Sequence, residues 1–169
     1  LIGAYSGLRL SDFTRIKPEH IITDQGVEMI NLYTMKTRTE VCIPLMPELK
    51  KVLEKHNYTS PDPISSQRMN EYIKEVCKKA KIKRNVVHKY SKGGKVNEGH
   101  SPLWTLISTH TARRSFATNF YEIGIPAAML KEITGHSTER QFFEYINIDK
   151  KKAARNMASM VAEIMKNRK

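Results

Sequence analysis

Residues 108–145 read STHTARRSFATNFYEIGIPAAMLKEITGHSTERQFFEY, and this stretch decides how the chain folds. A Ser-Thr pair that can cap a helix opens it, so we expect a helix from His110 to Ile123, where a glycine follows. A second helix is expected between Pro126 and Gly135, because proline suits the start of a helix and glycine its end. A third, short helix is expected to carry Tyr145. The stretch therefore predicts three consecutive helices.

The residues before this stretch predict more helix and a small sheet. We expect residues 1–15 to be helical and residues 23–26 to form a turn. Segments 27–34 and 38–44 are rich in Val, Ile, Tyr and Thr, which is typical of paired antiparallel strands. A helix is expected from Pro47 to His56, since proline suits a first helical position.

Further helices are predicted by apolar residues at three- and four-residue spacing. One begins at Ser65 or Ser66, and its apolar face holds Met69, Tyr72, Ile73, Val76 and Ala80. Residues 82–102 break the helical period and predict a basic hairpin or a mobile flap. A last helix carries Ala153, Ala154, Met157, Met160, Val161 and Ile164 on one side. The predicted fold class is mainly α with a small antiparallel β-sheet (α+β).

The charge of the chain indicates a polyanionic partner. Lys and Arg number 29 against 17 Asp and Glu, a net charge of +12. Such an excess favours nucleic acid or an anionic membrane surface. No apolar run approaches the roughly 18 residues that a membrane-spanning helix needs. We expect nucleic acid and no membrane as the partner. The segment from Lys74 to Lys95 is the most basic, with nine Lys or Arg and one acid, Glu75.

Cysteine usage and the first residue bear on where the chain works. Cys42 and Cys77 lie 35 residues apart and form neither a CxxC pair nor a disulfide framework. We expect a reducing, cytoplasmic setting. Because the chain begins with Leu1 in what reads as the middle of a helix, we expect it to be an excised fragment.

The reactive residues fit metal-free chemistry on a phosphate. The acids are scattered, and neither DxD, HExxH nor metal-ligand spacing among the histidines and cysteines occurs, so we expect no metal site. His110 and Arg113 lie three apart on a predicted helix, on one face. A guanidinium can bind two phosphate oxygens while an imidazole donates to another or transfers a proton.

Taken singly, these residues have ordinary explanations. His110 and Arg113 could be surface residues of an amphipathic helix, and Tyr145 could be a core aromatic residue. Arg9 could simply pair with Asp12 on a helix, and a hairpin lysine such as Lys36 is usually a solvated charge.

In their order along the chain, however, these pieces resemble the tyrosine recombinase (phage-type integrase) family. The pieces are SGLRLSD at 6–12, a hairpin lysine before IPL at 43–45, HTARRSF at 110–116, TGHS at 134–137, and a tyrosine nine residues after the histidine. The resemblance covers residues 1–148 and implies the fold of this family's catalytic domain. It also implies an upstream core-binding domain, which we expect to be absent from these residues. The remaining residues, 149–169, are expected to form a C-terminal helix that docks in cis or in trans.

The resemblance implies a catalytic set of six residues: Arg9, Lys36, His110, Arg113, His136 and Tyr145. Tyr145 would attack the scissile phosphate of DNA and form a 3′-phosphotyrosyl link with a free 5′-hydroxyl. The two arginines would hold the non-bridging oxygens, and the two histidines would hydrogen-bond the phosphate, one of them taking the tyrosine proton. Lys36 would protonate the leaving oxygen. Rejoining needs neither ATP nor a cofactor, because the covalent link conserves the energy of the broken bond.

Double-stranded DNA is the implied partner, bound by a homotetramer on paired sites. The expected DNA-contacting residues are Arg38, Lys89, Lys92, Lys95 and Arg114. Helix geometry allows either Arg113 or Arg114 to reach the site, and the resemblance selects Arg113. The chain departs from the family at Thr134, where Leu commonly precedes Gly-His, and residues 82–102 are longer than a minimal member needs.

Three other functions fit parts of this pattern. A type IB topoisomerase would use the same nucleophile to relax supercoils as a monomer, and strand exchange between two sites would separate it from a recombinase. A catalytically inactive DNA-binding module is disfavoured because all six positions carry the expected residue types. An interaction domain independent of nucleic acid would lack a steep salt dependence of DNA binding.

Overall fold

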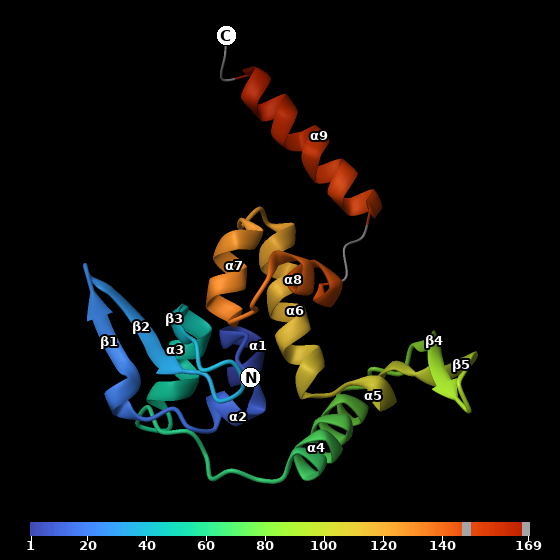
Figure 1. Ribbon diagram of the computed structural model, residues 1–169, viewed down its shortest axis with the longest axis horizontal. Coiled ribbons are helices and arrows are strands. Elements are labelled where there is room, and N and C mark those ends of the chain that lie inside the picture. The colour runs from blue at the N-terminus through green and yellow to red at the C-terminus, as the bar shows by residue number, and fades with distance from the viewer. Residues whose placement is uncertain (147–149, 167–169) are drawn as a thin grey trace.

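The computed structural model describes residues 1–146 and 150–166, without the side chains of Lys92, Lys150, Lys152 and Glu163. The predicted mainly α fold with small antiparallel sheets is confirmed (Figure 1). The helices are α1 Ile2–Ser6, α2 Leu10–Phe13, α3 Pro47–Glu54, α4 Ser66–Lys79, α5 Leu103–Leu106, α6 Thr109–Glu122, α7 Ala127–Thr134, α8 Glu139–Tyr145 and α9 Lys150–Lys166. The strands are β1 Ile21–Asp24, β2 Val27–Tyr33, β3 Glu40–Pro44, β4 Asn85–Lys92 and β5 Lys95–Pro102, and a 3-10 turn spans Pro18–His20.

The sheet β1–β2–β3 is antiparallel, with β2 in the middle. It has a third strand that the sequence did not predict, because Thr23 and Asp24 pair with β2 instead of turning. The turn is confined to Gln25 and Gly26, both at positive φ, which suits a two-residue hairpin loop. Alternate residues of β2 and β3 are buried against α1 and α3, and the cluster holds Ile2, Leu8, Ile16, Ile30, Leu32, Val41, Ile43, Leu49 and Leu53.

The prediction of one helix over residues 1–15 is wrong. Gly7 ends α1 in a left-handed conformation, with φ +67°, and α2 begins only at Leu10. A Cβ at Gly7 would lie 2.5 Å from the ring of Phe116 on α6. The helical pattern of the sequence continues through Gly7 and does not predict the end of α1. The helix ends there because α1 approaches α6 closely, which only glycine allows.

Helices α6, α7 and α8 form the second core and confirm the three helices predicted from residues 108–145. Its buried residues are Phe116, Ala117, Leu130, Phe142 and Ile146. Ser108 is the N-cap residue of α6, and its main-chain amide donates to the Thr111 hydroxyl at 3.1 Å. Asn70 on α4 adds a second cap by accepting from the Thr109 amide at 2.9 Å. Ile133 packs against both cores and joins them.

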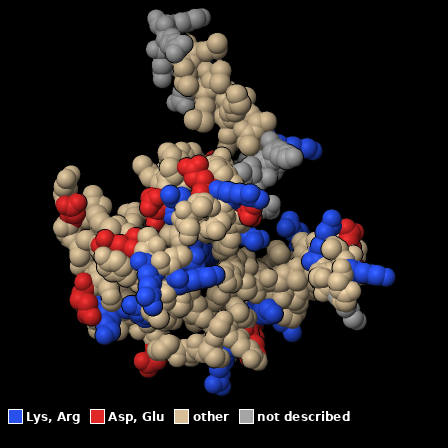
Figure 2. All heavy atoms as spheres, viewed as in Figure 1, with Lys and Arg blue, Asp and Glu red and all other residues tan. Residues whose placement is uncertain are grey.

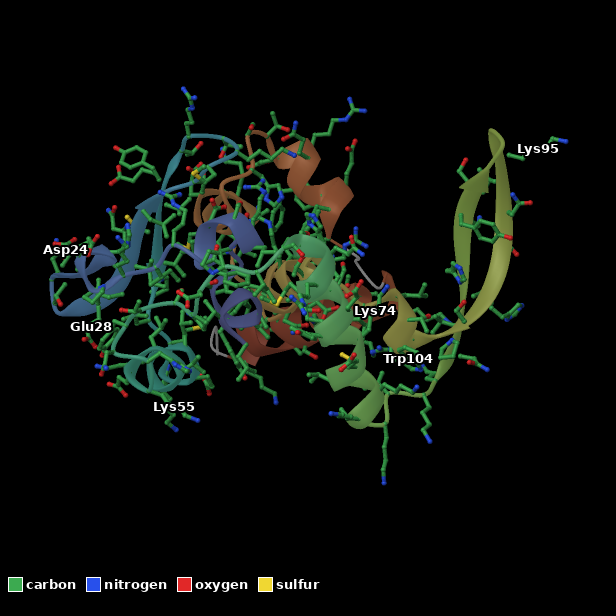
Figure 3. All side chains as sticks on the ribbon, turned by 90° about the horizontal axis from the view of Figure 1, so that it is seen from below. Asp24, Glu28, Lys55, Lys74, Lys95 and Trp104 are labelled. Carbon is green, nitrogen blue, oxygen red and sulfur yellow. The ribbon has the colours of Figure 1, made fainter. Side chains whose placement is uncertain are left out.

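Of the two structures predicted for residues 82–102, the chain forms the hairpin, β4–β5. Its turn consists of Gly93 and Gly94, both at positive φ. The backbone of Lys92 lies opposite that of Lys95 at the end of the two strands. The hairpin projects from the body beyond α5, with Lys95 at its tip (Figures 1 and 3). Its backbone therefore places basic side chains outside both cores.

Helix α9 confirms the predicted last helix, but it points away from the other helices (Figure 1). Its contact with the body includes a hydrogen bond from Asn156 to the Glu122 carbonyl at 2.7 Å. The apolar residues on it are largely exposed, Met157 by 69% and Ile164 by 51%. None of the helices within residues 1–146 and 150–166 combines the length and hydropathy of a membrane span.

Replacing Gly7 by alanine tests the close approach of α1 to α6. Both the left-handed strain and the contact with Phe116 oppose a Cβ there, so we expect the free energy of unfolding to fall by about 2–4 kcal/mol in chemical denaturation. Gly26→Ala is the matched control, because Gly26 has φ +81° but nothing within 4 Å of the added Cβ. Its cost is expected near ~1 kcal/mol. Equal losses in the two variants would show that Phe116 does not restrict position 7.

Candidate active site

Five separate segments bring the six predicted catalytic residues together. Arg9 precedes α2, and Lys36 lies in the turn between β2 and β3. His110 and Arg113 occupy the first turns of α6, His136 follows α7, and Tyr145 ends α8. They line one cleft of about 480 Å³, whose residues are Arg9, Lys36, Thr37, His110, Arg113, Arg114, Gly135, His136, Ser137, Gln141, Glu144 and Tyr145.

Arg113 is the buried centre of this cleft, only 2% exposed. Its guanidinium donates to the Gly7 carbonyl at 2.7 Å and to the Thr134 carbonyl at 2.5 Å. Burial, and then the neighbouring charge of Arg9, lower the pKa of Arg113 to about 10, so it stays protonated at neutral pH. Arg113 therefore ties α1 and α7 to α6 while it brings a positive charge to the cleft.

Asp12 lies behind the cleft and supports it, although its spacing from Arg9 indicated only an ordinary partner for that arginine. Its carboxylate is fully buried and accepts from the Met35 amide at 2.8 Å, next to Lys36. No ion pair between Arg9 and Asp12 is found among the described residues. Asp12 thus fixes the turn that carries Lys36 relative to α2. The three-residue spacing from Arg9 was the signal in the sequence, but it did not reveal this long-range partner.

The turn carrying Lys36 is held by threonines. Thr34 is buried, and its hydroxyl lies 2.7 Å from the Thr37 hydroxyl and 3.1 Å from the Thr39 carbonyl. Gly135 packs beneath this turn, where a Cβ would meet Val41 and Thr34. The backbone of the turn is therefore fixed, whereas the Lys36 side chain is exposed and lines the cleft.

Tyr145 is half-buried among cationic and aromatic groups. Its hydroxyl donates to the His110 carbonyl at 3.0 Å, and its ring lies 5.2 Å from the guanidinium of Arg114 and 5.8 Å from that of Arg113. Burial raises the pKa of the phenol, although the nearby arginines oppose that rise. In this state Tyr145 is protonated, and as a nucleophile it would need a group to take its proton.

The two histidines are the candidates for that group. Burial, and then Arg113 and Arg9, lower the pKa of His136 to about 4. Burial and the same arginines also lower the pKa of His110. Both imidazoles are therefore neutral at neutral pH, so each has a nitrogen lone pair that can accept a proton. Within the described part of the chain, no three His, Cys, Asp or Glu side chains cluster as metal ligands.

The residues predicted to contact DNA fall into two groups. Arg114 lines the cleft and lies over Tyr145, and Arg38 is exposed on the same turn as Lys36. Lys89 and Lys95 lie on the β4–β5 hairpin, which does not line that cleft, and Lys89 faces Glu98 at 3.8 Å. The side chain of Lys92, on the same hairpin, lies outside the described residues. Lys and Arg gather over the middle of the face shown in Figure 2 and on the hairpin at its right.

Comparison of the sequence with protein families identifies the chain. The family described as the Phage integrase family matches residues 1–152. The chain belongs to the phage integrase family. A search of curated protein sequences found no match.

Solved structures share the fold of this integrase domain. The XerA recombinase superposes with a TM-score of 0.68 at 17% identity, over 94% of this chain and 55% of its own. A XerH recombinase bound to its difH substrate after cleavage gives 0.60 at 14%, over 93% and 43%. A lambda integrase dimer bound to a core site gives 0.58 at 21%, over 86% and 50%. The chain thus has the fold of tyrosine recombinases and spans about half the length of these proteins.

Proposed function

We propose that this integrase domain cuts and rejoins DNA at specific sites through a covalent bond between Tyr145 and a phosphate. The observation that carries the proposal is the cleft itself. It combines one phenol, three arginines, two neutral histidines and an exposed lysine, drawn from five segments of the chain. Groups that can bind a phosphate, attack it and move its protons are thus within one site.

The proposed reaction balances with these residues alone. Arg9 and Arg113 bind the non-bridging oxygens and stabilise the negative charge that grows on them. The Tyr145 oxygen bonds to phosphorus as the bond to the 5′-oxygen breaks, which leaves a 3′-phosphotyrosyl link. A histidine takes the phenol proton, and Lys36 gives a proton to the departing 5′-oxygen. Attack by the 5′-hydroxyl of another strand reverses these steps and releases Tyr145.

We also propose double-stranded DNA as the substrate, contacted by basic residues around the cleft. The XerH and lambda integrase structures were both determined with DNA. Arg38 and Arg114 would contact phosphates near the scissile bond, because they lie beside Lys36 and Tyr145. Lys89, Lys92 and Lys95 would contact phosphates farther along the duplex, and an antiparallel ribbon such as β4–β5 fits a major groove.

A nicked suicide substrate tests the nucleophile. We expect the enzyme to form a protein–DNA adduct that survives denaturing electrophoresis and is unaffected by EDTA. Tyr145→Phe removes the attacking oxygen, so the adduct is expected to disappear while DNA affinity stays within about threefold, because the ring and its arginine neighbours remain. Tyr33→Phe is the control, since Tyr33 is 61% exposed and does not line the cleft. An adduct that persists in Tyr145→Phe would mean that another residue attacks the phosphate.

A substrate with sulfur in place of the 5′-oxygen tests Lys36. Sulfur leaves without a proton, whereas oxygen needs one. Lys36→Ala is therefore expected to slow cleavage of the normal substrate by roughly 10²–10⁴-fold and to cleave the sulfur substrate at near the wild-type rate. The measurement is the single-turnover rate on both substrates. If Lys36→Ala slowed cleavage of both substrates equally, Lys36 would contact the phosphate without donating the proton.

The division of the chain into residues 1–148 and 149–169 leads to a proposal about assembly. Helix α9 exposes an apolar stripe of Met157, Met160, Val161 and Ile164, with exposures between 43% and 69%. Most of the stability of a helix in a protein comes from packing of its apolar face, so the stripe on α9 needs a surface to cover it. We infer that α9 docks on a neighbouring copy of the chain and links protomers, a tetramer on paired sites in all. Tyr145 precedes α9 in the chain, so its position would then depend on assembly of the protomers.

Removing residues 152–169 tests this docking. Because no described residue of α9 belongs to either core, the truncated protein is expected to keep its melting temperature while it loses higher-order complexes on DNA with paired sites. Native gel shifts and thermal unfolding measure the two effects. Met160→Glu with Ile164→Glu is expected to match the deletion, because it makes the stripe polar without shortening the chain. Unfolding of the truncated protein would show instead that α9 completes its own domain.

A further inference from the structure

A second pocket, of about 440 Å³, adjoins the cleft that holds Tyr145. The pocket and the cleft have four lining residues in common, which are Arg9, Lys36, His110 and Arg113. Tyr145 lines the cleft and does not line the second pocket. The second pocket therefore extends from the four shared residues on a side that the proposed nucleophile does not reach.

The charges around the second pocket suit an anion. Arg9, Lys36 and Arg113 are cationic, and none of the described residues that line the pocket is an Asp or a Glu. Nη1 of Arg9 is buried and has no hydrogen-bond partner among the described residues. A buried donor without a partner is costly, and a phosphate oxygen would satisfy it. The charge and the unpaired donor both favour a phosphate as the ligand.

Three hydroxyl groups line the second pocket and not the cleft, those of Ser11, Ser66 and Thr109. None of these hydroxyls makes a hydrogen bond within the described part of the chain. Ser66 and Thr109 are the first residues of α4 and α6, whose first turns hold no acid. Hydroxyl side chains and helix starts are common phosphate contacts in protein–DNA complexes. Thr14 also lines the pocket, but its hydroxyl already donates to the Leu10 carbonyl at 2.8 Å.

The geometry of phosphoryl transfer indicates which part of the DNA would lie there. The attacking and leaving oxygens are roughly in line, on opposite sides of phosphorus. If the scissile phosphate sits on the four shared residues and Tyr145 attacks from the cleft, the departing 5′-oxygen points away from the cleft. Lys36 lines both the cleft and the second pocket, as the group that protonates this oxygen must. The second pocket is thus on the side of the leaving strand.

We propose that the second pocket binds the leaving strand, and that Ser11, Ser66 and Thr109 donate to the next phosphate on its 3′ side. The inference rests on the proposed cleavage reaction and adds a binding site for the strand that ends in the free 5′-hydroxyl. Holding this phosphate keeps the 5′-hydroxyl close to the phosphotyrosine, where it can attack and reseal the strand. The three hydroxyls are binding residues, because the phosphate that they contact does not react.

A methylphosphonate in place of this phosphate tests the contact, because it removes the negative charge at one defined position. Dissociation constants for intact duplexes are measured in the Tyr145→Phe background, which lacks the proposed nucleophile. Ser11→Ala with Ser66→Ala removes two of the hydroxyls. Thr14→Val is the matched control, since it removes a hydroxyl from the same pocket whose proton is already used.

With both serines present, the methylphosphonate is expected to weaken binding roughly tenfold, which corresponds to about one hydrogen bond to a charged group. In the double serine variant, the normal duplex is expected to bind about tenfold more weakly and the methylphosphonate to cost only about twofold more, because the contact is already lost. Thr14→Val is expected to keep the tenfold cost. A methylphosphonate on the 5′ side of the scissile phosphate is expected to cost the same in all three proteins.

An equal cost of the methylphosphonate with and without the two serines would overturn the proposal. A cost that instead disappears in the double variant on the 5′ side of the scissile phosphate would also overturn it. If the double variant does not fold, Ser66→Ala alone carries the same comparison. The proposed cleavage stands or falls separately, by the adduct of the wild-type enzyme, since these binding measurements involve no cleavage.

Discussion

The buried guanidinium of Arg113 is the constraint on which the rest of this domain depends. A buried charge is costly unless its donors are satisfied, and here the carbonyls of Gly7 and Thr134 accept from it. These two acceptors come from chain segments 127 residues apart, so the guanidinium joins the N-terminal helices to α7 through α6. Gly7 reaches it only because the chain turns left-handed there. The same hydrogen bonds therefore hold the two cores together and fix the position of the Arg113 guanidinium.

This arrangement prepares the cleft before any substrate binds. Arg113 fixes the end of α7, and with it the position of His136, while Asp12 fixes the turn that carries Lys36. The charged groups need little reorganisation when a phosphate arrives, which is the physical basis of electrostatic catalysis. Tyr145 is the exception, because its protonated hydroxyl is hydrogen-bonded to the His110 carbonyl. In the proposed reaction that bond must break before attack, so the proposed nucleophile is the part of the site that substrate or assembly would control.

Much of this site could be predicted from the sequence because its signals are local. The caps and glycines around His110–Arg113 and His136 set the helices, and the order of the motifs indicated the family. The break at Gly7 could not be predicted, since its cause is a contact with Phe116, 109 residues away. The bond from Met35 to Asp12 is equally long-range. Thr134 was noticed as a departure from the family, but its bond to His136 depends on the fold around Gly135.

The central claim is that the phosphate becomes bonded to Tyr145 and to no other residue. Mass spectrometry of the trapped adduct, after nuclease and trypsin digestion, tests it directly. Trypsin cuts after Arg140 and Lys150, so the modified peptide is expected to be Gln141–Lys150, with the nucleotide phosphate on its tyrosine. Fragment ions would place the added mass on Tyr145. A nucleotide on a peptide that contains Tyr33, Tyr90 or any residue other than Tyr145 would contradict the account.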